Sequence, residues 1–284
     1  MSDESDNLPV NWPKHAASVA NNFINKISKA VGTWYEPTHK RRSAKADAAA
    51  KKIVLESALE SELQIRAFKR MMHEEERKQI NMEAVIEASY EHIEDTAKPE
   101  QLDDDWLIDF FDKAKKISDK QMQALWGKVL AGETNTPGTY TKATLQTVAL
   151  LEKADADLFA TLCRFVVVVW DVPLAFVFDY KAPIYTDLDI HFDTLHHLDD
   201  LGLLSFDPNE TVSRNGLPTF FEMRYGGSTF NCATASDFVL PVGHVVLTKT
   251  GEQLFGLSNA HPVDGFMDYL SKRWEASRIA LHPA

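Results

Sequence analysis

The sequence predicts a mainly α protein: a long N-terminal helical arm and a helical core, followed by a small α+β, winged-helix-like domain. Three observations predict this. Residues 38–98 contain neither Gly nor Pro across 61 positions, residues 106–163 alternate apolar helical stripes with turn residues, and short β-type runs follow Trp170. The expected parts are a disordered tail at 1–14, an amphipathic helix and the arm at 15–98, the core at 99–170, the winged-helix-like domain at 171–258, and a C-terminal helix or tail at 259–284.

The core begins with an apolar helical face at Trp106–Ala114, preceded by acids that favour a helix N-terminus. Ser118 and Gln121 have capping-box spacing, so they predict the start of a second helix, and Gly132 is placed to end it.

Pro137 and Gly138 predict a turn, Thr141 or Thr144 caps a third helix, and Ala154–Trp170 is a fourth. Four short helices with tight turns pack their stripes together. The block is either a protein-binding helical module or a plain structural core.

Several runs in and around this block resemble one family. They are LWGKVLAGE (125–133), PGTYTKATLQTVALL (137–151) and DADLFATLC (155–163), with VGTWYEPTHKRRSAKADA (31–48) and EEERKQINMEAVIEA (74–88) upstream and LTKTGEQLFGL (247–257) downstream. The chain resembles the uncharacterised bacterial family DUF2806 over roughly residues 25–257. The resemblance implies no established activity.

Composition is that of a soluble globular protein, with 44% hydrophobic and 25% charged residues in 284. A net charge of −12 argues against a general nucleic-acid binder. Cys163 and Cys232 form neither a disulfide framework nor a zinc site, and the polar N-terminus is not a secretory signal. We therefore expect a cytoplasmic protein.

One segment, Leu158–Phe178, is apolar enough to raise the question of a membrane. Arg164, Asp171 and Pro173 interrupt it, and a spanning helix needs about 20 mostly apolar residues. We expect a buried helix leading into a buried strand, and no membrane span. The amphipathic helix Ala16–Val31 either lies on a membrane surface or docks on the protein itself.

The arm carries an apolar stripe that we expect to contact another protein or a second copy. As one helix, residues 38–98 would be about 90 Å long, too long for a small domain to cover. The run HEEERKQ at 73–79 lacks apolar residues, so the arm is one helix with a solvated waist or two helices with a break there. A hairpin or an intermolecular bundle would bury the stripe. Its residues are Ile53, Leu59, Leu63, Phe68, Met71 and Met72.

A basic cluster at the start of the arm is opposed by Asp47 alone. Such a cluster neutralises phosphates of nucleic acid or lipid, or forms a solvated helix face. Its residues are Lys40, Arg41, Arg42, Lys45, Lys51 and Lys52.

The order of elements after Trp170 resembles a winged helix, with a recognition helix at Phe192–Leu203 and wing strands at Thr219–Tyr225 and Val242–Leu247. Residues 182–213 contain seven acids and no Lys or Arg. Phosphates would be repelled, so we do not expect DNA contact through the 192–203 helix.

No residue pattern predicts catalysis. His191, His196 and His197 lie near acids but match no metal motif, Cys163 lies on an apolar face, and Glu133 has no partner acid in view. Glu133 matches the family's LAGE run, and the resemblance implies that it makes a structural contact at a helix end. We expect no catalytic residue, metal or cofactor.

The sequence thus favours a non-enzymatic protein of the bacterial cytoplasm that acts by protein interaction or oligomerisation. A role in defence against phage is a further expectation within this class. The alternative is a nucleic-acid-associated regulator that binds through Lys40–Lys52, and a third reading is an enzyme with an unrecognised site.

Overall fold

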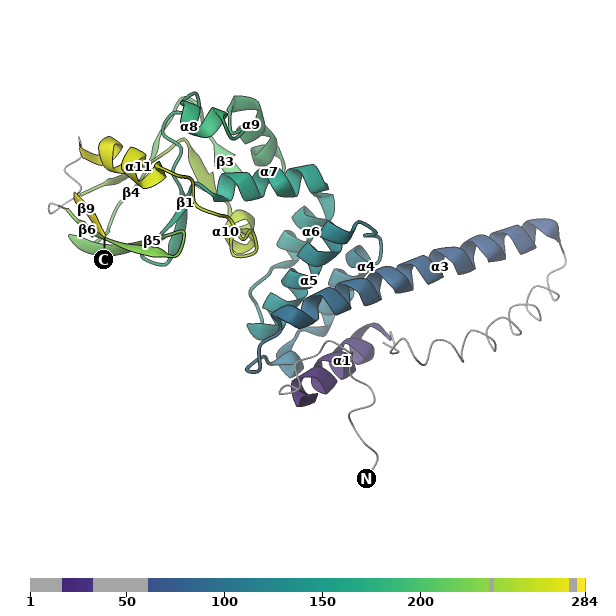
Figure 1. Cartoon of the computed structure of the whole chain (residues 1–284). Helices are drawn as coiled ribbons and strands as arrows, with labels where there is room; N and C mark the ends of the chain where they lie inside the picture. Colours follow the sequence, from purple (N-terminus) through teal and green to yellow (C-terminus); the bar gives the residue numbers. More distant parts are fainter. Residues whose placement is uncertain (1–16, 33–60, 235–237, 276–279, 284) are drawn as a thin grey trace. The chain divides into compact units, whose positions relative to one another are not determined.

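The structure is a computed structural model, described at residues 17–32, 61–234, 238–275 and 280–283 (Figure 1). The predicted tail at 1–14 lies outside the described residues. The chain divides into two compact units between Leu145 and Gln146. Each unit is described by itself.

The first unit is helical. Its elements are α1 (Ala17–Val31), α3 (Glu62–Ser89), η3 (Tyr90–His92), η4 (Pro99–Gln101), α4 (Asp104–Ala114) and α5 (Lys120–Asn135), and α6 (Lys142–Leu150) crosses the division between the units.

Helix α1 confirms the amphipathic helix predicted at Ala16–Val31. Gly32, at φ +66°, follows its last turn. Phe23 and Ile27 are buried, and α1 packs against α4 and η4. The Lys26 ammonium lies 2.7 Å from the Asp104 carboxylate. The apolar side of α1 therefore docks on its own unit.

Helix α3 begins at Ser61, whose side chain forms a capping box with Gln64. Because the Ser61 backbone is extended (φ −139°, ψ 151°), an uninterrupted helix from residue 38 is wrong. A break at 73–79 is wrong as well, since α3 runs through that segment. The Glu74 carboxylate forms ion pairs with Arg70 and Lys78, which lie one turn away on either side. Such pairs stabilise an exposed helix.

The C-terminal third of α3 packs tightly on α5 (Figure 1). A Cβ on Gly127 would lie 2.8 Å from the Ala88 carbonyl carbon, so the two backbones approach too closely for any other residue there. The Asn81 amide donates to the Lys115 carbonyl at 3.0 Å, and the Gln123 amide donates to the Asn81 side-chain oxygen at 3.3 Å. Close packing and buried hydrogen bonds together fix this part of α3.

Two sequence predictions for α5 are wrong. Its cap is Asp119, whose carboxylate accepts from the Gln121 and Met122 amides. Ser118 instead accepts a hydrogen bond from Asn81. Gly132 lies inside the helix, because α5 continues to Asn135, and a Cβ there would lie 2.8 Å from the Tyr140 ring.

Glu133 makes the structural contact that the sequence predicts. Its buried carboxylate accepts from the Gly138 amide at 2.6 Å and from the Tyr140 amide at 2.8 Å. The Trp106 indole donates to the Tyr140 carbonyl at 2.7 Å. Burial, with a smaller effect of the nearby Glu133 charge, raises the pKa of Tyr140 to about 12. The 133–140 turn is thereby clamped to the end of α5 and to α4.

The second unit is α+β. Its helices are α7 (Lys153–Cys163), α8 (Pro183–Thr186), α9 (Phe192–Asp200), α10 (Lys249–Phe255) and α11 (Phe266–Glu275). Its strands are β1 (Val166–Val169), β2 (Val172–Ala175), β3 (Leu204–Phe206), β4 (Val212–Arg214), β5 (Phe220–Tyr225), β6 (Ser228–Ala233), β7 (Leu240–Gly243), β8 (Val245–Leu247) and β9 (Ala280–Pro283).

The main sheet of this unit has five antiparallel strands in the order β2-β1-β5-β6-β9 (Figure 1). Two further pairs, β3–β8 and β4–β7, are also antiparallel. An aromatic core holds α11 in this unit: Phe266 lies edge-on to Phe165 at 5.2 Å, and Trp274 lies edge-on to Phe176 at 5.2 Å. Tyr185 donates its hydroxyl to the Phe176 carbonyl at 2.8 Å.

The predicted fold class, mainly α with a helical arm and a small winged-helix-like domain, is therefore wrong. The helix predicted at Ala154–Trp170 ends at Cys163, and the four valines that follow form β1, because β-branched side chains favour strands. Strand β5, predicted as a wing, pairs with both β1 and β6. The run Ile184–Tyr185 lies in the short helix α8.

The Glu133 clamp yields the first prediction. Glu133→Ala should lower the free energy of unfolding by about 2–4 kcal/mol, because two amides lose a charged acceptor. Glu133→Gln should cost less, because one acceptor oxygen remains. Urea unfolding followed by circular dichroism measures both.

The control is Lys142→Ala, at an exposed position of α6, which should change stability by less than about 0.5 kcal/mol. A Glu133→Ala protein as stable as this control would show that the clamp contributes nothing.

Candidate functional site

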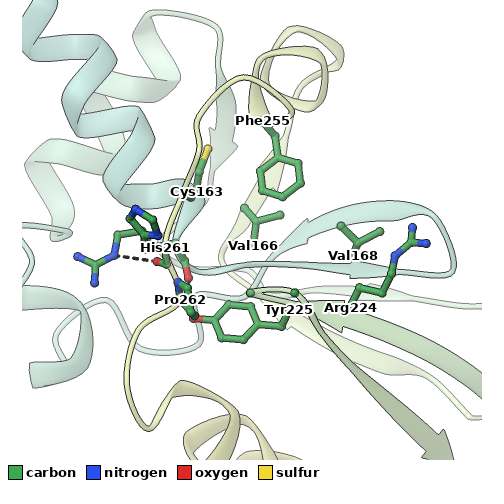
Figure 2. Close-up of a pocket in the computed structure, with 12 residues that line it drawn as sticks. Cys163, Val166, Val168, Arg224, Tyr225, Phe255, His261 and Pro262 are labelled. Carbon is green, nitrogen blue, oxygen red and sulfur yellow. Dashed lines mark hydrogen bonds between the residues drawn. The ribbon is translucent and has the colours of Figure 1, made fainter. Parts of the chain in front are cut away.

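Two features of the described chain have the character of a binding site. One is a pocket in the second unit, and the other is the exposed part of α3. The pocket has a volume of about 360 Å³ and lies over one face of β1, beside the turn that joins β5 to β6 (Figure 2).

Strand geometry places the floor of the pocket. Val166 and Val168 are two residues apart on β1, so they point to the same face. Arg224 of β5 is the register partner of Val168. Phe255, at the end of α10, and Pro262 complete the apolar lining.

The segment 260–262 forms one wall, and three contacts hold it. Tyr225 donates its hydroxyl to the Arg164 carbonyl at 2.8 Å and accepts from the Val263 amide at 2.6 Å. Arg164 Nε donates to the His261 carbonyl at 3.1 Å, the dashed line in Figure 2. These bonds link the start of β1, the end of β5 and the 260–263 segment.

The β5–β6 turn needs glycine. Gly226 and Gly227 have φ of +56° and +84°, a region that other residues rarely adopt. A Cβ on Gly226 would lie 2.6 Å from Pro262 Cγ. The turn can therefore lie directly against the 260–262 segment and close that side of the pocket.

The pocket is cationic although the chain is acidic. Its described lining includes Arg164, Arg224 and His261, and no Asp or Glu. Arg224 forms an ion pair with Asp171 at 2.6 Å, in which both side chains are more than half exposed. Within the described residues, the terminal nitrogens of Arg164 make no hydrogen bond or ion pair.

The titratable groups of the pocket are poorly suited to nucleophilic chemistry. Cys163 is 1% exposed, and burial, partly offset by a hydrogen bond with Ser258, raises the pKa of its thiol to about 12. Burial also raises the pKa of Tyr225, against the effect of the Val263 amide. Both groups are protonated at neutral pH, so neither is a ready nucleophile.

The second feature is the exposed stripe of α3, which we define as Leu63, Phe68, Met71 and Met72. Leu63 is 68% exposed, Met71 48% and Met72 40%, and Phe68 is half-buried. Ile80, which is 51% exposed, lies on another side of the same helix. No residue from Glu62 to Ile80 is buried, whereas α3 is largely covered from Asn81 onward.

The structure brings few of the other predicted site residues together. The basic cluster Lys40–Lys52 and the stripe residues Ile53 and Leu59 lie outside the described residues. His197 pairs with Asp155 at 2.7 Å, and His191 pairs with Asp189 at 3.1 Å. Among the described residues, no three His, Cys, Asp or Glu side chains converge as metal ligands.

Sequence reasoning missed the pocket. Arg164, Arg224 and Pro262 are distant along the chain and meet because β1 pairs with β5. The one local signal was the Gly226–Gly227 pair, which indicated a turn without indicating what the turn packs against.

The buried thiols yield the second prediction. At pH 8 a thiol with a pKa of about 12 is ionised in about one molecule in ten thousand. Iodoacetamide should therefore leave Cys163 and Cys232 unmodified in the folded protein and alkylate both in urea, as mass spectrometry of the two samples would show. Alkylation of folded Cys163 at the rate of the unfolded control would contradict this assignment.

The described residues include no helix that is both long and apolar enough to cross a membrane. The segment Leu158–Phe178, which raised that question, comprises the end of α7, then β1 and β2.

Comparison with known proteins supports one assignment. A search of curated proteins finds no match, and neither does a search of solved structures. The family model for DUF2806, described as a protein of unknown function, matches residues 65–271, which include most of α3, the Glu133 clamp and the pocket. The chain therefore belongs to the DUF2806 family.

Proposed function

We propose that the protein acts by association rather than catalysis, and that two copies pair through the exposed stripe of α3. The observation that carries the proposal is the contrast within one helix. No residue from 62 to 80 is buried, and this part of the helix exposes the apolar side chains of Leu63, Met71, Met72 and Ile80 to solvent.

This contrast matters because exposed apolar side chains that lie along one element mark interaction sites more often than isolated ones do. Residues 62–80 are 19 positions long, which gives about 28 Å of helix at 1.5 Å per residue. A surface of that length suits pairing with another helix.

Charge favours a second copy as the partner. Arg66, Lys69 and Arg70 precede Glu74, Glu75 and Glu76 along α3, and Arg77 and Lys78 follow. In an antiparallel pair centred on Met71, Arg66 of each helix lies opposite Glu76 of the other. Parallel pairing would place like charges together.

The compartment and source belong to the same proposal. We place the protein in the bacterial cytoplasm; the resemblance to a bacterial family and the two free thiols, Cys163 and Cys232, support this. A defence role remains an expectation that rests on the resemblance alone.

Self-association yields the third prediction. Light scattering on the full chain should give 64.0 kDa, twice the 32.0 kDa of one chain. Met72→Glu should give 32.0 kDa at the same concentration, because an unpaired carboxylate would be buried in the contact.

The matched control is His73→Glu, which introduces the same carboxylate at another exposed position of α3, about 100° around the helix from Met72 and about 160° from Met71 at 100° per residue. It should leave the dimer intact. A wild-type chain that remains a monomer, or two variants that dissociate equally, would rule out pairing through this stripe.

The alternative, a nucleic-acid-associated regulator acting through Lys40–Lys52, rests on sequence alone. It yields the fourth prediction: a fluorescent DNA duplex should show no binding at about 0.15 M salt, since a net charge of −12 opposes phosphates. Binding that Lys51→Glu weakens would favour the alternative.

A further inference from the structure

We propose that the pocket beside the β5–β6 turn binds a small organic anion: an apolar body that carries one carboxylate or phosphate group. This inference does not depend on self-association, because every residue it uses lies in the second unit.

Size and lining define the class of ligand. A volume of about 360 Å³ lies at the lower end of the roughly 300–1,000 Å³ typical of small-molecule sites. Val166, Val168, Phe255 and Pro262 supply an apolar surface. That surface favours an aryl or acyl group and excludes a fully hydrated inorganic ion as the best ligand.

The positive charge of the pocket lining indicates that the ligand is an anion. Arg164 and Arg224 line a pocket whose described lining contains no acid, in a chain of net charge −12. Local cationic lining in an acidic protein concentrates anions at one place. A guanidinium group donates in a planar fork that matches the oxygens of carboxylate and phosphate.

The two arginines lie at opposite ends of the pocket, so one anionic group binds one of them, and we assign it to Arg224, the register partner of Val168. Arg164 is held at the other end by the bond from its Nε to the His261 carbonyl. Arg224 is paired with Asp171, but an ion pair this exposed is weak, so an incoming anion can compete for the guanidinium. In Figure 2, His261 and Arg224 lie at opposite ends of the view, with Val166 and Val168 between them.

The backbone around the turn is suited to the same purpose. Gly226 lies so close to Pro262 that a Cβ would collide with it at 2.6 Å. On this side the pocket is therefore bordered by glycine backbone and a compact proline ring, which leave its volume unfilled. This closeness explains why glycine is required at 226 even apart from its φ of +56°.

The test is titration calorimetry of the full chain with four probes: phenyl phosphate, phenylacetate, benzyl alcohol and inorganic phosphate. Phenyl phosphate or phenylacetate should bind at least tenfold more tightly than benzyl alcohol, because the neutral alcohol cannot accept a charge-assisted hydrogen bond from the guanidinium group. Inorganic phosphate should also bind more weakly than phenyl phosphate. The tighter of the two aryl anions identifies the natural head group as phosphate or carboxylate.

Variants locate the site. Arg224→Gln should weaken binding of the tighter aryl anion at least tenfold, and Arg164→Gln, at the other end of the pocket, should weaken it less. The matched control is Arg214→Gln, the same substitution on β4, outside the described lining of this pocket. It should leave the affinity unchanged.

Three results would overturn the proposal. These are no heat of binding with either aryl anion, equal affinity for the anions and benzyl alcohol, and equal losses in Arg224→Gln and Arg214→Gln. A negative result in these binding tests does not change the mass expected from light scattering, so the two proposals are tested independently.

Discussion

The close approach of α3 to α5 at Gly127 is the constraint on which the first unit depends. It allows Val85 and Ile86 to be buried and brings Asn81 into hydrogen-bonding distance of Gln123 and of the loop before α5. Since these contacts hold only the C-terminal third of α3, the residues from Glu62 to Ile80 remain in solvent. The ion pairs around Glu74 add about 0.2–0.5 kcal/mol each to the stability of this uncovered part of the helix. The exposed stripe is thus a direct consequence of where the packing stops.

The second unit is organised differently, around hydrogen bonds that cross long sequence separations. The Tyr225 hydroxyl bonds to both Arg164 and Val263, and it ties β5 to the start of β1 and to the segment after α10. The same bonds leave a pocket rather than a filled core, because the glycines of the β5–β6 turn contribute no side chains. The first unit thus offers an apolar surface and the second a cationic pocket, which suggests two distinct binding roles in one chain.

Local patterns predicted local structure well. The apolar periodicity of Trp106–Ala114, the turn at Pro137–Gly138 and the amphipathic helix that ends at Val31 all appear as expected. Errors arose where a local pattern had two solutions. Asp119 and Ser118 are both good caps, and Val166–Val169 continued an apolar helical stripe although its valines favour a strand. The pairing of strands decided the fold class. Strands β1 and β5 pair residues that are more than fifty positions apart, and the local periodicity of the sequence carries no information about such distant pairs. The pocket was missed for the same reason, whereas the structural role of Glu133 was implied by the family resemblance.

The central proposal is that a second copy of the chain covers residues 62–80. Hydrogen exchange of the full chain at low and high protein concentration tests it directly, because amides in an uncovered helix open locally far more often than amides in a packed one. Exchange in residues 62–80 should slow as the concentration rises, while exchange in residues 81–89, which already pack on α5, should not change. Fast exchange in residues 62–80 at every concentration would contradict the account.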